Sequence, residues 1–196
     1  MIAGVPPGGE PRTGMRTRVH LPAGIWVLGF VSMLMDISSE LVHSLLPVFM
    51  TTVLGVSMVT IGVIEGVAEG AAAITRVFSG VISDYFGRRK IPAVAGYALS
   101  ALTKPVFPLA STVGWVFGAR FVDRLGKGIR GAPRDALVAY IPPLTHRTAA
   151  YGFRQALDSV GAFVGPLLAI GLMFWFADDI RAVFWVAVIP AFLAVA

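Results

Sequence analysis

The chain has 196 residues, of which 56% are hydrophobic and only 14% are charged, and its mean hydropathy is +0.78. Soluble domains carry about 25% charged residues, so the composition excludes an ordinary soluble domain and indicates an integral membrane protein. The chain contains no cysteine, which excludes a disulfide framework, a thiolate metal site and a cysteine nucleophile. The basic residues behind the net charge of +5 lie between apolar segments and inside one of them, which favours cytoplasmic loops over nucleic-acid binding.

Residues 1–22 are rich in Pro, Gly and Arg and show no apolar period, so they are expected to form a disordered cytoplasmic tail. Apolar segments separated by short polar breaks follow, and a helix of about 20 apolar residues spans a bilayer. The predicted helices are 23–50, 57–83, 91–110, 114–140, 149–176 and 181 to the end. Residues 23–196 are therefore expected to form one all-α transmembrane domain, a six-helix bundle.

The charges in the breaks predict the orientation of the bundle. The tail and the second and fourth breaks carry basic residues, including Arg88, Arg89 and Lys90. The first and third breaks are uncharged. Since cytoplasmic loops are enriched in Lys and Arg, the N-terminus is expected to be cytoplasmic, in an inner or plasma membrane.

One predicted helix is unusually polar, because residues 120–137 include seven charged side chains. At 100° per residue these fall within about 140° of the helix circumference. An ionised side chain at the bilayer centre costs about 2.5–3.5 kcal/mol, so this stripe is expected to face carboxylates or water inside the bundle. The charged residues are Arg120, Asp123, Arg124, Lys127, Arg130, Arg134 and Asp135.

Carboxylates that could face this stripe occur on the first two helices at helical spacing. A group of intramembrane ionisable residues indicates a substrate or proton path. The residues predicted to line a transport cavity and couple protons are Asp36, Glu40, Glu65, Glu69, Arg120, Asp123, Arg124, Lys127 and Arg130. Helix 91–110 carries only Lys104, which is expected to snorkel to the interface, and the last helix is uncharged beyond Arg181, so both are expected to face outward.

Other interpretations of these features stay open. Each charge could belong to an ion pair that merely ties helices together, and basic residues every three or four positions also describe a voltage sensor. Gly126, Gly128, Gly131 and Pro133 would interrupt such a sensor helix. No metal-ligand spacing or nucleophile motif supports an enzyme, and no metal or cofactor is expected. Gly62, Gly66 and Gly70 predict close packing of a neighbouring helix.

The second break, Gly80-Val-Ile-Ser-Asp84-Tyr-Phe-Gly87-Arg88-Arg89-Lys90, resembles the signature between helices 2 and 3 of the major facilitator superfamily. That signature is Gly-x-Leu-x-Asp-Arg-x-Gly-Arg-Arg/Lys, so this chain departs from it at Ile82 and Tyr85. The segment opened by Arg120 is similar to the family's helix 4 motif, Arg-x-x-x-Gly-x-Gly. The fifth helix resembles the family's antiporter motif, except that Ala169-Ile170 replaces its final Gly-Gly. The matching residues there are Gly152, Gly161, Gly165 and Pro166.

The resemblance implies the first half of a twelve-helix fold in which each half is built from inverted three-helix repeats. It implies a secondary transporter working by alternating access, with proton-coupled export or antiport of a small charged or amphiphilic solute. Asp84 and Arg88 would latch the cytoplasmic side, with Gly80 and Gly87 in the same gate motif. Partners would be the lipid bilayer, the solute, protons and a second six-helix half, with no nucleic acid. The alternative is a non-transporting membrane subunit that binds a partner through its charged helix.

Overall fold

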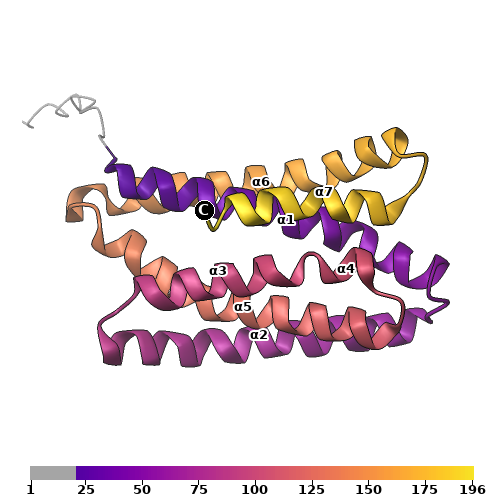
Figure 1. Ribbon diagram of the computed structural model, residues 1–196. Coiled ribbons are helices and arrows are strands. Elements are labelled where there is room, and N and C mark those ends of the chain that lie inside the picture. Colours follow the sequence, from indigo (N-terminus) through magenta and orange to yellow (C-terminus); the bar gives the residue numbers. More distant parts are fainter. Residues whose placement is uncertain (1–20) are drawn as a thin grey trace, which may run out of the picture.

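The computed structural model describes residues 21–196, and within them all regular structure is helical. The expected tail lies, up to residue 20, outside the described residues. The all-α six-helix bundle is confirmed, with α3 and α4 together forming the third helix (Figure 1). The elements are α1 (Ala23–Thr52), α2 (Met58–Phe86), α3 (Lys90–Thr103), α4 (Val106–Leu109), α5 (Val113–Tyr140), η1 (Leu144–His146), α6 (Arg147–Trp175) and α7 (Ile180–Leu193).

Among the described residues, three helices are long and apolar enough to cross a membrane by themselves: α1, α2 and the segment of η1 and α6. α7 is apolar but has only 14 residues. α5 has 28 residues, long enough to span, and its charged side chains are what separate it from the three apolar spans. The stability of α5 in a bilayer must therefore come from its neighbours.

The prediction of one continuous helix over residues 91–110 is wrong in one respect, because the helix is interrupted at Lys104 and Pro105. Proline has no backbone N–H and its ring clashes with the preceding turn, so it ends α3. The turn tightens there, where the Lys104 amide donates to the Ala101 carbonyl oxygen at 3.1 Å. The four residues of α4 then complete the span.

The helices form two layers of three, seen one above the other in Figure 1. One layer holds α1, α6 and α7, and the other holds α2, α3 and α5. Within the layers, α1 packs on α6 and α7, while α5 packs on α2 and α3. The first helix of each sequence repeat thus packs on the second and third helices of the other repeat, as expected for inverted three-helix repeats.

The glycines of α5 do not interrupt it, contrary to the sequence-based expectation, since α5 is one continuous helix with Pro133 inside it. Two of them instead allow close helix packing. A Cβ at Gly126 would lie 2.8 Å from the Gly96 carbonyl oxygen of α3, and one at Gly128 would lie 2.6 Å from the Ala72 carbonyl oxygen of α2. α5 therefore fits between two backbones that it nearly touches.

The α2 glycines behave differently. A Cβ added at Gly62, Gly66 or Gly70 would meet no described atom within 4 Å. The expected close-packing neighbour is therefore absent among residues 21–196, and this stripe of α2 is open.

An apolar cluster closes the bundle at the end where the turns carry no basic residue. Its aromatic centre is Phe184 of α7, whose ring centroid lies 5.4 Å from that of Phe49 and 6.3 Å from that of Phe107. The cluster also includes residues of α2 and α5, so it joins the two layers. At the opposite end, where the turns are basic, a smaller apolar cluster of Ile25, Val138 and Ala150 joins the layers, and polar contacts lie beside it.

We expect Gly128→Ala to lower the thermal stability of the chain in detergent, because the new methyl group would overlap the α2 backbone. Overpacking of this kind costs about 1–3 kcal/mol. Gly118→Ala on the same helix is the matched control, since a Cβ there meets nothing within 4 Å. Equal melting temperatures for the two variants would contradict the close α2–α5 contact.

Candidate functional site

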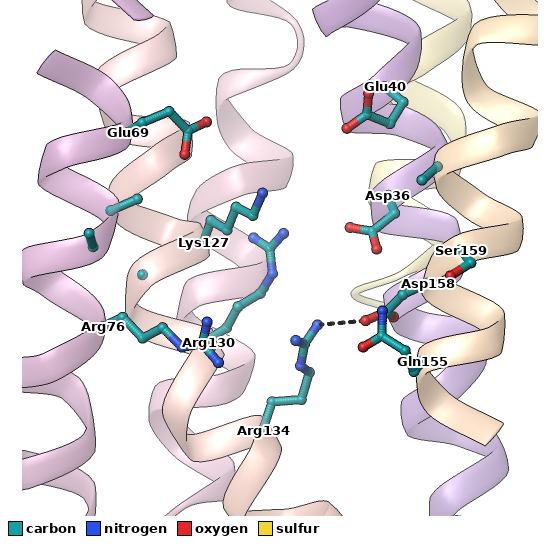
Figure 2. Close-up of a pocket in the computed structure, with 15 residues that line it drawn as sticks. Asp36, Glu40, Glu69, Arg76, Lys127, Arg130, Arg134, Gln155, Asp158 and Ser159 are labelled. Carbon is teal, nitrogen blue, oxygen red and sulfur yellow. Dashed lines mark ion pairs between the residues drawn. The ribbon is translucent and has the colours of Figure 1, made fainter. Parts of the chain in front are cut away.

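A polar cavity of about 470 Å³ lies between the two layers. Figure 2 shows its charged side chains on two facing sides, one formed by α2 and α5 and the other by α1 and α6. α3 and α7 contribute no side chain to the lining, as expected for helices that face outward. The charged and amide lining residues are Asp36, Glu40, Glu69, Arg76, Lys127, Arg130, Arg134, Gln155 and Asp158.

On the α5 side, Lys127 and Arg130 form what we call the basic wall. Lys127 makes no hydrogen bond or ion pair with any described residue. Arg130 is only 3% exposed, donates to the Ser100 hydroxyl at 2.6 Å and lies over the Tyr97 ring at 4.8 Å. Neither cation has a carboxylate of the described chain within ion-pair distance.

On the facing side, Asp36 and Glu40 of α1 form what we call the acidic wall. They are one helical turn apart and both are half-buried. Neither side chain makes a hydrogen bond or an ion pair within residues 21–196. The cavity therefore has two cations on one side and two carboxylates on the other, and none of the four forms an ion pair within the described residues.

The antiporter-like motif of α6 supports the acidic wall directly. A Cβ at Gly161 would lie 3.0 Å from the Asp36 Cβ, and one at Gly165 would lie 2.6 Å from the Glu40 Cβ. These two glycines let α6 approach α1 at the two carboxylates, and Pro166 lies within the same continuous helix. Gly152 has no described atom within 4 Å of such a Cβ, so it takes no part in this contact.

The remaining charges of the lining are paired within the chain. Arg76 donates to the Asp135 carboxylate at 2.7 Å, and the Glu69 carboxylate forms an ion pair with Arg124, whose Nε lies 3.0 Å away. Asp158 lies 3.1 Å from Arg154 and 4.0 Å from Arg134. These pairs fix the edges of the cavity.

Several of these contacts join the two layers at the end with the basic turns. Arg134 of α5 donates to the Ser32 hydroxyl of α1 at 2.8 Å, and Ser32 in turn lies 2.9 Å from the Tyr97 hydroxyl of α3. Arg154 of α6 lies 3.3 Å from the Asp135 carboxylate of α5. These polar contacts supplement the small apolar cluster of Ile25, Val138 and Ala150 at this end, whereas the larger apolar cluster around Phe184 holds the other.

Four predicted site residues lie outside the cavity lining, in a buried network beside it. Arg120, only 1% exposed, donates to both carboxylate oxygens of Glu65, the shortest contact being 2.6 Å. Arg120 also lies 3.3 Å from His43 Nδ1. A desolvated guanidinium needs such partners, and two parallel bonds to a carboxylate are its strongest arrangement. The residues in this network are Glu65, Arg120, Asp123 and Arg124.

Lys104 does not snorkel, so that expectation is wrong. Its side chain is 1% exposed, and its ammonium lies 3.0 Å from the Asp123 carboxylate and 3.1 Å from the Ser39 hydroxyl. The break at Pro105 ends α3 just where Lys104 turns inward onto α5. Burial of the acid and the base together avoids an uncompensated charge in the low-dielectric interior.

The gate motif lies at the turn between α2 and α3. Gly87 has φ +61°, a left-handed conformation that glycine adopts easily, and it ends α2. Gly80 lets α5 approach, since a Cβ there would lie 3.2 Å from that of Ala132. Asp84 pairs with Arg89 at 3.3 Å, whereas Arg88 is exposed.

Sequence reasoning missed Arg154, Gln155, Asp158 and Ser159 of α6. The sequence did hold a signal, because Arg154 and Asp158 are four residues apart in an otherwise apolar segment, the spacing of a helical ion pair. Gln155 and Ser159 are uncharged residues on the same helix, which periodicity alone does not assign to a cavity.

Known proteins match this chain both in sequence and in fold. The family model described as "Major Facilitator Superfamily" matches residues 28–196. This chain belongs to the Major Facilitator Superfamily. An uncharacterised MFS-type transporter of Methanocaldococcus jannaschii is 34% identical over 89% of this chain and 43% of its own length. A probable 4-methylmuconolactone transporter of Cupriavidus pinatubonensis is 29% identical over 74% of this chain and 34% of its own length.

A solved relative shares the fold of this facilitator chain. The crystal structure of a POT family transporter in complex with 5-aminolevulinic acid superposes with a TM-score of 0.78 and 21% identity, over 94% of this chain and 38% of that one. The chain thus spans less than half the length of these relatives. It is an integral membrane chain of a transporter family.

We expect Lys104→Met to destabilise the bundle strongly, because it leaves the Asp123 carboxylate buried without its cation. Removing one partner of a buried pair costs about 3–5 kcal/mol. The double variant Lys104→Met/Asp123→Leu should recover much of this loss. Asp84→Asn, which breaks the exposed pair with Arg89, is the control and should change stability by less than about 1 kcal/mol. Thermal unfolding in detergent measures all three, and a double variant no more stable than Lys104→Met would contradict the account.

Proposed function

We propose that this chain is the first six-helix half of a secondary transporter that works by alternating access, with the polar cavity as its solute path. The observation that carries the proposal is the pair of facing walls between the two helix layers, whose charges form no ion pair within the described residues. Intramembrane ionisable groups that are not paired within the protein mark a substrate or ion path.

Proton coupling is proposed at Asp36, Glu40 and Glu69. Asp36 and Glu40 face the cavity and have no ion-pair partner among the described residues, so either could take up a proton without breaking a bond. The charged groups that face Asp36 are Asp158, Arg130, Arg134 and Lys127. Glu69 is half-exposed, pairs with Arg124 at 3.0 Å and lies 4.0 Å from Arg120, so its protonation would weaken its contacts with both cations.

Export by antiport is supported by the α6 glycines, which bring the antiporter-like motif into contact with the acidic wall. A relative at 30% identity, over 64% of this chain and 31% of its own length, is the multidrug resistance protein MdtH of Proteus mirabilis. We propose a small charged or amphiphilic solute, with Arg120 coupling protonation to rearrangement.

The cytoplasmic side is proposed to be the end with the basic turns, which places the N-terminus there. The cavity lies toward this end, and the apolar cluster closes the other. We propose that Asp84 and Arg88 latch this end in another conformational state. In the present structure Asp84 already has one cation beside it, Arg89.

A second six-helix half is proposed to dock on the open stripe of α2. Gly62, Gly66 and Gly70 offer a smooth helix face without a neighbour among the described residues. Small residues at four-residue spacing allow close helix packing in membranes. The half could be a separate chain, a second copy or a covalently continuous segment.

Transport by the assembled protein in proteoliposomes tests the coupling, with benzoate, ethidium and ε-aminocaproate as anionic, cationic and zwitterionic probes. We expect an imposed pH gradient to drive at least one probe and an uncoupler to abolish the flux. Glu40→Gln should lower the rate by about tenfold or more, the usual weight of a group that transfers protons. Asp178 is an exposed carboxylate in the α6–α7 turn, so the control variant Asp178→Asn should keep the wild-type rate. Uncoupler-insensitive flux would refute proton coupling, and binding of a probe without any flux would favour the non-transporting subunit.

Cross-linking in native membranes tests the docking face, and since residues 1–196 contain no cysteine, an introduced cysteine is the sole thiol of this six-helix segment. We expect Gly66→Cys to cross-link to a second six-helix segment with a short thiol reagent. Val94→Cys on the exposed side of α3 is the control and should not. Equal yields at both positions, or a monomeric active species without a second half, would contradict the proposal.

A further inference from the structure

We infer that the cavity binds a zwitterion, with the anionic group of the solute at Lys127 and Arg130 and its cationic group at Asp36 and Glu40. This inference rests on the proposed function, since it names the solute class of the same cavity. It follows from which charges of the lining are already paired and on which side the unpaired ones lie.

The lining carries four cations and four carboxylates. Half of these eight are paired within the chain. Arg76 pairs with Asp135, and Glu69 pairs with Arg124. Arg134 and Asp158 lie 4.0 Å apart, and Asp158 also pairs with Arg154. The four that remain are two cations and two carboxylates, so their charges sum to zero.

The unpaired charges are separated by sign. Both cations belong to α5, in one layer, and both carboxylates belong to α1, in the other, with the cavity between them (Figure 2). Each wall is also held in place on its own side. Arg130 is fixed by Ser100 and Tyr97, and the α1 backbone at the carboxylates is fixed by its close contact with Gly161 and Gly165.

This arrangement discriminates between classes of solute. An anion would satisfy the basic wall and leave Asp36 and Glu40 without a cation, while a cation would leave Lys127 and Arg130 without an anion. Groups left desolvated and unpaired cost binding free energy. A solute with both charges, spaced to span the cavity, satisfies both walls at once.

The same geometry explains how solute and protons could exchange. The cationic group of the zwitterion and a proton would occupy the same carboxylates, so binding of one displaces the other. A carboxylate that loses its proton to the cavity as the ammonium group arrives keeps its charge compensated throughout. Such competition at one site is sufficient for antiport without a second proton site.

The test measures binding of two ω-amino acids of different length, γ-aminobutyrate and ε-aminocaproate, to the full chain in lipid nanodiscs by isothermal titration. Each is compared with its methyl ester, which keeps only the cation, and its N-acetyl derivative, which keeps only the anion. We expect at least one parent compound to bind about tenfold or more tightly than both of its derivatives, the weight of one charge-assisted hydrogen bond. A derivative that binds as tightly as its parent, or no binding of either parent, overturns the inference.

Variants assign the two ends of the solute. Lys127→Gln should remove the preference for the zwitterion over its ester, which lacks the anion, and keep the preference over the N-acetyl derivative, which lacks the cation. Glu40→Gln should keep the preference over the ester and remove the preference over the N-acetyl derivative. Lys127→Arg should restore the first preference, and Asp178→Asn should change neither. Loss of both preferences in a variant that unfolds at the wild-type temperature overturns the assignment. If Lys127→Gln or Glu40→Gln does not fold, the derivative series on the wild-type chain and on Lys127→Arg decides.

The outcome is separable from that of the transport experiment. Zwitterion preference in binding without gradient-driven flux would remove the proposed transport activity and leave this inference standing. Flux of benzoate or ethidium without a zwitterion preference would do the opposite.

Discussion

The burial of charge on α5 is the constraint on which the rest of the bundle depends. Arg120 and Asp123 lie within α5, away from its ends, and are almost fully buried, so each needs a partner of opposite charge. Glu65 of α2 supplies one and Lys104 at the end of α3 supplies the other. Because these partners come from both sides, they fix α5 between α2 and α3. The glycines of α5 then allow the backbones to come close enough for the bonds to form.

The cavity follows from the two-layer arrangement. α5 packs against α2 and α3, and α1 packs against α6 and α7. The remaining polar faces of α5 and α1 therefore lie on opposite sides of the cavity. The large apolar cluster around Phe184 joins the layers at one end. At the other end, ion pairs and hydroxyl contacts join them together with a smaller apolar cluster of Ile25, Val138 and Ala150. Ion pairs can be exchanged for water, and the apolar cluster beside them is much smaller than the one around Phe184, so the end with the basic turns is the better candidate for opening in an alternating-access cycle.

Much of this could be predicted from the sequence. Hydropathy located the spans, and the cost of intramembrane charge led from the α5 stripe to Glu65 and Glu69, which do pair with it. The sequence could not show which charges are paired and which are free, because residues on one helix face divide between the buried network and the cavity according to helix rotation. Arg120 and Lys127 share a stripe, yet one is buried and the other exposed.

Two errors have a common cause. Lys104 was expected at the interface and the α5 glycines were expected to break their helix, since both interpretations treated a helix without its neighbours. Lys104 turns inward because Asp123 lies opposite it, and the glycines stay helical because backbones pack on them. Asp158 was missed for a related reason, since a single ion pair within an apolar helix is weak evidence until a cavity is seen beside it.

The central claim is that the charged stripe of α5 faces a water-filled cavity and buried partners, and that its opposite face does not. Labelling of single-cysteine variants along α5 with a membrane-impermeant thiol reagent tests this most directly. The account predicts fast labelling at position 127 and slow labelling at positions 125 and 129. Added substrate or a change of pH should alter the labelling rate at position 127 and leave the rates at the other two positions unchanged. Labelling of Leu125→Cys or Ile129→Cys as fast as that of Lys127→Cys would contradict it.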